Sequence, residues 1–233
     1  MQHNIYGMIK VLFEDNHLIA VNKSVADIVQ VDKTGDLSLE DKVKEYIKAK
    51  YKKPGKVFLG VTHRIDRPVS GVVLFARTSK ALARINQMFQ DKEIKKTYWA
   101  IVKDKPPEDS GTLIHYLVRN TEKNKSFVYE REAKNAKQAI LSYKIIDKSD
   151  KYYLLEVNLE TGRHHQIRCQ LAKIGCPIRG DLKYGYPRSN EDGGISLLSR
   201  SIEFIHPVTQ LKVKILADPP DDTLWNFFKS KHA

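Results

Sequence analysis

The spacing of hydrophobic and polar residues changes several times along the chain, and each change predicts a different element. Residues 9–23, IKVLFEDNHLIAVNK, alternate like two short strands separated by a turn pair at residues 15–16. Ser38 then precedes acidic residues and an apolar stripe at Leu39, Val43 and Ile47. This spacing predicts a helix that begins after Ser38 and runs through Tyr51.

Later segments repeat this mixture of strands and helices. Ser79 is the predicted N-cap of a helix over 80–92, and Gly175 is predicted to close a helix over 164–175 at its C-cap position. Strands are expected at 72–76, 98–102, 139–146 and 152–159, and a hairpin over 196–217 that turns at His206-Pro207. Because strands outnumber helices and often follow one another directly, the pattern predicts an α+β fold with a mostly antiparallel sheet.

The charge of the chain indicates what kind of partner it binds. The 233 residues include 40 Lys and Arg against 28 Asp and Glu, a formal net charge of +12. Such a balance favours polyanionic partners, because each phosphate that is neutralised releases condensed counterions. From charge alone, a nucleic-acid partner and an ordinary solvated basic surface are about equally supported.

Other bulk features narrow the class of protein. No apolar run approaches the roughly 20 residues that span a bilayer, and the N-terminal stretch lacks the apolar core of a signal peptide. We therefore expect a cytoplasmic protein without a membrane segment. The two cysteines, Cys169 and Cys176, have no metal-binding spacing and are expected in the core.

One candidate for chemistry is the stretch HRIDRPVSG at residues 63–71. Asp66 lies in a polar turn between apolar strands, with Arg64 and Arg67 beside it, and Gly71 permits a tight backbone path. A carboxylate among arginines is as readily explained by a loop salt bridge as by catalysis.

A second candidate is ETGRHHQIR at residues 160–168. A Gly-Arg turn that leads into a helix with His, Gln and Arg in its first turns is suited to hold a phosphate, through backbone amides and the guanidinium group. The same residues are also typical of the first turn of an ordinary polar helix that binds no ligand. Adjacent histidines without an i, i+4 partner do not form a metal motif, so we expect no metal.

A third candidate is KKTYWA at residues 95–100, where lysines lead into an aromatic strand. Cations suit phosphates and a ring face suits a base. The simpler interpretation places Tyr98 and Trp99 on the two sides of a half-buried strand.

Together these stretches resemble the RluA-type pseudouridine synthase family, in the same order and at similar separations. HRIDRPVSGVVLFA is similar to the family's His-Arg-Leu-Asp signature, with Val69 where the family usually has Thr. Lys96-Thr97-Tyr98 matches its Lys-x-Tyr motif, and residues 162–168 match its Gly-Arg-x-His-Gln-Ile-Arg motif. GCPIRGDLKYG and SLLSRSIEFIHP resemble two later motifs, so the resemblance extends from Val11 to Ala217.

The resemblance implies an isomerase that converts uridine in RNA to pseudouridine without cofactor or metal. Asp66 would act covalently, either on the ribose or on the base. Arg168 would stand beside the carboxylate and favour its ionised form. Tyr98 would stack on the uracil, and its hydroxyl could remove a ribose proton.

The remaining matched residues imply contacts with the RNA. The target uridine must leave its helix or loop, and Arg64 is suited to fill the vacated stack. Leu198 would cover the base from the other side, although Leu197 is nearly as good a candidate. The other predicted RNA or base contacts are Arg67, Lys96, Arg163, His165 and Gln166.

The family's core is a bent, mostly antiparallel sheet with flanking helices, and we expect it as a single catalytic domain over residues 1–233. The matched pattern begins by Val11, which leaves no room for the N-terminal S4-like RNA-binding module of many members. RNA contact must then come from the catalytic domain itself. Basic residues in an insertion-like segment could supply it, although a solvated face is the simpler interpretation: Lys123, Lys125, Arg131, Lys134 and Lys137.

The sequence leaves other functions open. A catalytically inactive RNA-binding protein with the same fold would not need the carboxylate of Asp66. A metal-dependent nuclease would need clustered carboxylates, which the sequence does not contain. We therefore expect a monomeric RNA pseudouridine synthase acting on rRNA or tRNA, and the sequence does not identify the RNA or the uridine.

Overall fold

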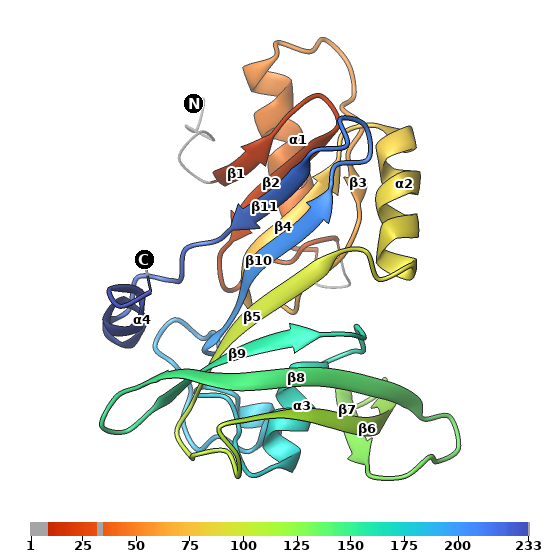
Figure 1. Ribbon diagram of the computed structural model, residues 1–233. Helices are drawn as coiled ribbons and strands as arrows, with labels where there is room; N and C mark the ends of the chain where they lie inside the picture. Colours follow the sequence, from red (N-terminus) through yellow and green to blue (C-terminus); the bar gives the residue numbers. More distant parts are fainter. Residues whose placement is uncertain (1–8, 32–34, 233) are drawn as a thin grey trace. The chain divides into compact units, whose positions relative to one another are not determined.

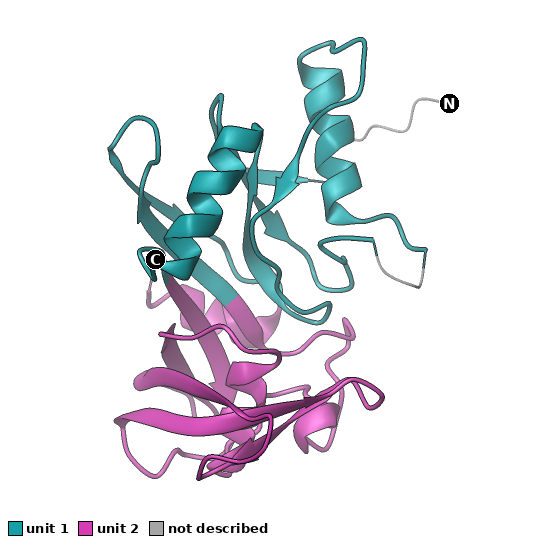
Figure 2. Cartoon of the chain, turned by 90° about the vertical axis from the view of Figure 1, so that its right-hand side faces the viewer, with its two compact units in different colours: residues 1–95, 199–220 teal, residues 96–198, 221–233 magenta. Residues whose placement is uncertain are grey.

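The computed structural model describes residues 9–31 and 35–232, and these fall into two compact units (Figure 2). Unit 1 comprises residues 1–95 and 199–220, and unit 2 comprises residues 96–198 and 221–233. Each unit therefore combines two separate stretches of the chain. The predicted single domain over residues 1–233 stays a prediction.

Unit 1 is built on a sheet in which most neighbouring strands are antiparallel (Figure 1). Its strands are β1 (Lys10–Glu14), β2 (Leu18–Lys23), β3 (Gly60–Val61), β4 (Ser70–Ala76), most of β10 (Leu197–Ile205) and β11 (Lys212–Leu216). The order is β1-β2-β4-β10, with β3 beside β4 and β11 beside β10. The predicted hairpins over 9–23 and 196–217 are confirmed. Every residue of β4 is buried, and such a strand reads as a continuous hydrophobic run rather than an alternating one.

Two helices, α1 (Leu39–Lys50) and α2 (Ser79–Gln90), accompany this sheet. Ser38 caps α1 as predicted, since its hydroxyl accepts a hydrogen bond from the backbone N–H of Asp41. The predicted cap of α2 was wrong by one residue. The N-cap is Thr78, whose extended backbone lets its hydroxyl accept from the N–H of Ala81.

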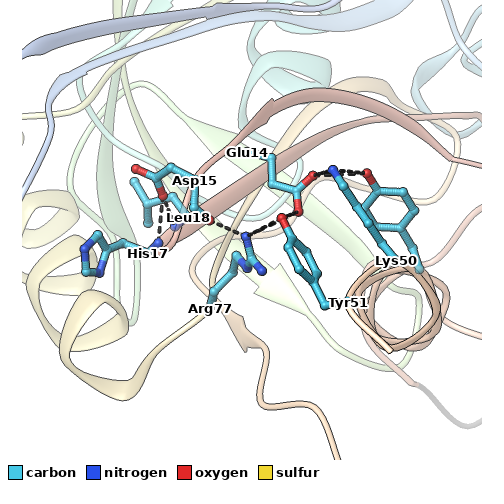
Figure 3. Close-up of polar contacts among 8 residues, drawn as sticks. Glu14, Asp15, His17, Leu18, Lys50, Tyr51 and Arg77 are labelled. Carbon is cyan, nitrogen blue, oxygen red and sulfur yellow. Dashed lines mark hydrogen bonds and ion pairs between the residues drawn. The ribbon is translucent and has the colours of Figure 1, made fainter. Parts of the chain in front are cut away.

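A polar network joins the end of α1 to the ends of β1 and β4 (Figure 3). The carboxylate of Glu14 accepts hydrogen bonds from Lys50 at 2.6 Å, Tyr51 at 2.8 Å and Tyr46 at 3.0 Å, and it pairs with Arg77 at 3.3 Å. Burial raises the pKa of Glu14, but these hydrogen bonds lower it more strongly, so the net pKa lies below its usual value.

Unit 2 contains a second run of antiparallel strands in the order β5-β9-β8-β6-β7. These are β5 (Lys95–Val102), β6 (Ser110–Asn120), β7 (Lys125–Tyr129), β8 (Lys137–Lys148) and β9 (Tyr153–Leu159). The predicted strands within β5, β8 and β9 are confirmed. The sequence did not assign β6 and β7, and the segment treated as an insertion forms β7 and the turns on either side of it.

Helix α3 (Gln166–Lys173) packs on β6 and β7, and α4 (Thr223–Lys229) lies near the C-terminus. Helix α3 begins two residues later than predicted. Its C-cap residue is Ile174 rather than Gly175, which follows it with φ +84°. Cys169 and Cys176 are free and buried, as predicted. The elements of both units confirm the α+β class.

Candidate active site

The turn that carries Asp66 lies directly before β4 in unit 1. The backbone N–H of Val69 donates to the carbonyl of Asp66 at 3.0 Å, which closes the turn. Ile65 and Val69 are buried and anchor its two ends, whereas Asp66 is partly exposed. The fold therefore presents one carboxylate on a tight turn at the start of a fully buried strand.

Gly71 lets β4 begin close to β10. Its φ is +115°, and a Cβ atom at this position would lie 2.3 Å from the backbone oxygen of Ser199. No side chain fits there without moving the backbone of a strand. Gly71 therefore fixes where β4 begins. The first residue of β4, Ser70, follows Asp66 by four positions.

Lys23 is the functional candidate in unit 1 that the sequence reasoning missed. Its side chain is completely buried, and its ammonium group donates to the carbonyls of Ser24 at 2.8 Å and Arg67 at 3.0 Å. Burial lowers its pKa to about 8, while the negative charges of Asp27 and Asp66 oppose that shift. A lysine that ends the apolar run LIAVNK was the available signal. Lys23 therefore supports the Asp66 turn with hydrogen bonds and a positive charge.

The two arginines beside Asp66 have different surroundings. Arg67 is about half exposed and forms a salt bridge with Asp36 at 2.8 Å. Arg64 is exposed and lines an open cavity of about 460 Å³, together with Phe58, Leu82 and neighbouring residues. Unit 1 thus brings Asp66 and Arg67 together with Lys23. The predicted RNA contacts of Arg64 and Arg67 stay predictions.

Strand β5 carries Tyr98 and Lys96 in unit 2. Tyr98 is 7% exposed and lies opposite Val157 on β9. The ammonium group of Lys96 lies against Gly162, where an added Cβ would be 3.4 Å from it. Burial lowers the pKa of Lys96. The strand and the Gly162 turn, both chosen from motifs, therefore meet within this unit.

Arg168 has a partner that the sequence reasoning did not anticipate. Its guanidinium group binds the carboxylate of Asp181 through two hydrogen bonds, at 2.7 and 2.9 Å. The side chains are 5% and 1% exposed. A buried two-point pair of this kind holds the guanidinium plane in one orientation. The predicted pairing of Arg168 with Asp66 stays a prediction.

The turn before α3 is held by Gln166. Its side-chain oxygen accepts from the hydroxyl of Thr161 at 2.8 Å and from the N–H of Arg163 at 2.9 Å. Its amide nitrogen donates to the carbonyl of Ile140 at 3.0 Å. Gln166 is buried, and these partners brace the turn. Its predicted contact with RNA stays a prediction.

His165 occupies a strained position at the N-cap of α3, with φ +54°. Its ring stacks on His164 at a centroid distance of 3.7 Å, and its Nδ1 is 2.9 Å from the hydroxyl of Tyr184. Burial and the charge of Arg168 lower the pKa of His165 to about 2, so the ring is neutral near pH 7. Any contact of His165 with RNA would therefore be made by an uncharged ring.

The last predictions concern the leucine that covers the base, metal sites and membrane helices. Leu197 and Leu198 are both buried, at 4% and 0% exposure. Their burial therefore does not indicate which of the two would contact the uracil. Among residues 9–31 and 35–232, no cluster of three metal-binding side chains occurs. The helices in these ranges are also too short or too polar to cross a membrane.

Comparison with known proteins gives one consistent result. A family model described as RNA pseudouridylate synthase matches residues 17–173. The tRNA pseudouridine synthase C of Vibrio vulnificus is 31% identical over an alignment of length 239, which covers 94% of this chain and 93% of that protein. The ribosomal large subunit pseudouridine synthase D of Zymomonas mobilis is 30% identical over 224 residues, which cover 92% of this chain and 70% of that protein.

A solved structure supports the same fold. Human RNA Pseudouridylate Synthase Domain Containing 4 is similar with a TM-score of 0.78 and 21% sequence identity. The match covers 95% of this chain and 93% of that one.

Proposed function

The chain belongs to the RNA pseudouridylate synthase family and is an RNA pseudouridine synthase, and on this premise we propose that Asp66 is its covalent catalyst and rRNA or tRNA its substrate. The observation that carries the assignment of Asp66 is the turn before β4. It presents a partly buried carboxylate that interacts electrostatically with the buried ammonium group of Lys23.

The reaction breaks the N1–C1′ bond of uridine, turns the base and forms a C5–C1′ bond. The proton on C5 is lost to solvent and N1 gains one, so no oxidant or energy source is consumed. The carboxylate of Asp66 attacks the nucleoside, on the ribose or on the base, and leaves when the new bond forms. In this proposal Tyr98 stacks on the uracil, and its hydroxyl moves a ribose proton.

Other residues hold the RNA and the carboxylate. A uridine inside a folded RNA must be flipped out to reach Asp66, and Arg64 fills its place in the stack. We keep for Arg168 the role of favouring the ionised form of Asp66, while its partner within unit 2 is Asp181. We place this activity in the cytoplasm, carried out by a monomer, and light scattering of the purified protein tests the oligomeric state.

The test is release of tritium from RNA labelled at uracil C5. The wild type should release tritium from total rRNA or tRNA, whereas Asp66→Asn should release none while folding normally and binding RNA. Asp91→Asn is a matched control, because Asp91 is an exposed carboxylate at the end of α2 that accepts hydrogen bonds from Gln87 of the same helix.

Two outcomes would contradict this proposal. Activity of Asp66→Asn within tenfold of the wild type would remove Asp66 as the catalyst. Tight RNA binding by a wild type that releases no tritium would favour the alternative, an RNA-binding protein that keeps the fold without the reaction.

A further inference from the structure

The sheet formed by β6, β7 and β8 in unit 2 has one covered and one open face. On the covered face, Leu117 and Ala139 form a buried cluster with Cys169 of α3, and Val128 packs against it. Successive side chains of a strand point to opposite faces, so the neighbours of these residues point away from α3. In Figure 1, α3 lies behind β6 and β8.

The open face is apolar and aromatic, which is unusual for a surface exposed to water. Ile114, Phe127 and Tyr129 are 54%, 39% and 45% exposed. The strand register sets Tyr129 opposite Tyr116 and Phe127 opposite Val118. Two adjacent rows therefore cross from β7 to β6, one of two tyrosines and one of Phe127 and Val118. We call these five residues the outer face.

The turns that border the outer face carry an excess of positive charge. Residues 120–137 contain five Lys and Arg and three Glu: Lys123, Lys125, Arg131, Lys134 and Lys137 against Glu122, Glu130 and Glu132. One of the carboxylates, Glu130, is neutralised by Lys173 at 3.0 Å. Exposed aromatic rings bordered by cations suit a ligand that offers both flat rings and phosphates.

The outer face also adjoins the half of the candidate site that lies in unit 2. The Nε of Arg163 donates to the carbonyl of Gln138 at 3.0 Å, at the start of β8. In the register, Gln138 lies opposite Tyr116 of the outer face. A strand of RNA held at the turn of Arg163 therefore reaches the outer face without leaving unit 2.

We propose that the outer face binds single-stranded RNA next to the modified uridine, with bases stacked on Phe127 and Tyr129 and phosphates held by the bordering lysines and arginines. The inference rests on the proposed function, which makes RNA the substrate. Stacking needs only the flat face of a base, so this contact is tolerant of sequence. The segment that the sequence alone treated as a solvated face then supplies RNA contacts.

The test removes the two rings while keeping the strand. Phe127→Thr combined with Tyr129→Thr preserves strand propensity, and circular dichroism and thermal melting verify the fold. The dissociation constant for a fluorescein-labelled single-stranded RNA of mixed sequence should rise about tenfold, which is about 1.4 kcal/mol. Binding of a duplex RNA should change by less than about twofold, because stacked pairs offer no free ring face.

Three comparisons make the result specific. Phe127→Tyr combined with Tyr129→Phe keeps both rings and should bind single-stranded RNA like the wild type. Phe227→Ala is the matched control, since Phe227 is also 39% exposed but lies on α4. The single-turnover rate of tritium release at saturating enzyme should stay within about threefold of the wild type for every variant, because the outer face contributes binding.

The opposite results overturn the proposal. An unchanged dissociation constant in the folded Thr variant excludes stacking, and an equal loss for duplex RNA or for Phe227→Ala excludes a specific site. If the wild type is a dimer and the Thr variant is a monomer, the ligand of the outer face is a second copy of the chain instead of RNA. Failure of the proposed function would appear separately, as a wild type that binds RNA through these rings but releases no tritium.

Discussion

Replacing Lys23 with methionine should separate the stability of unit 1 from its activity. Burial lowers the pKa of Lys23 from 10.5 to about 8, and this difference corresponds to roughly 3 kcal/mol that the folded state loses by holding a charged lysine at neutral pH. Methionine removes that cost. It also leaves the carbonyls of Ser24 and Arg67 without the ammonium donor, at about 1–3 kcal/mol each. The loss of about 2–6 kcal/mol at the two carbonyls is thus partly offset by the gain of roughly 3 kcal/mol.

We therefore expect Lys23→Met to change the free energy of unfolding by no more than about 3 kcal/mol and to reduce the rate at least tenfold. The rate falls because the Arg67 carbonyl loses its anchor and the neighbouring Asp66 carboxylate loses a positive charge. Single-turnover tritium release measures the rate, and urea unfolding measures the stability. Lys42→Met is the matched control, because Lys42 also faces this cluster but pairs with Asp27 at 2.7 Å.

The pH dependence gives an independent check on the same residue. The folded pKa of Lys23 lies below its unfolded value, so the unfolded chain binds more protons between about pH 8 and pH 10.5. Wild-type stability should therefore contain a contribution that rises with pH in this window, and Lys23→Met should lack it. The other charged groups that act on Lys23 are Asp27, Asp66, Arg67 and Lys42. A rate for Lys23→Met within threefold of the wild type, or an equal loss in Lys42→Met, would refute the reasoning.

Further outcomes are expected elsewhere in the molecule. Arg168→Met should destabilise the protein by about 3–5 kcal/mol, because it strands the buried carboxylate of Asp181. Adding Asp181→Asn should restore much of the stability but not the rate of tritium release, and recovery of both would make Arg168 purely structural. Glu14→Gln should lower stability near pH 7 by about 1–3 kcal/mol and have little effect at low pH, because the lowered pKa of Glu14 stabilises the fold only above that pKa. Equal losses of stability at pH 7 and pH 3, measured by urea unfolding, would contradict this. RNA binding should weaken with salt, with a log–log slope of several units, and a flat titration would mean that the +12 charge is not at the interface. Activity should survive prolonged chelation, and loss that only a divalent metal reverses, with the RNA fold unchanged, would contradict a metal-free reaction.

Elements with a strong local pattern could be predicted from the sequence. The stripe Leu39, Val43 and Ile47 and the capping box at Ser38 and Asp41 settle α1, because all of their signals lie within one helix. The start of α2 could not be settled in this way. Thr78 and Ser79 both carry a hydroxyl, and only the extended backbone of Thr78 decides which one caps.

The candidate site was predictable only where its residues belong to motifs. Asp66, Tyr98 and Arg168 stand out by resemblance, but their partners come from distant parts of the chain. Lys23 reaches the carbonyl of Arg67 across 44 residues, and Asp181 follows Arg168 by 13 residues through an irregular segment. Such contacts depend on tertiary packing, which no local periodicity encodes.

The way the two units share the chain has a consequence for synthesis. In unit 1, β4 borders β10, so a ribosome that has made the first 95 residues has not yet supplied that sheet neighbour. Unit 2 is likewise incomplete until α4 emerges. The contacts between β4 and β10 close a long loop and therefore form late. Until then the edge of β4 that will pair with β10 is exposed and can pair with a wrong strand. A nascent chain stalled before residue 199 should therefore be a better substrate for chaperones and proteases than the finished protein.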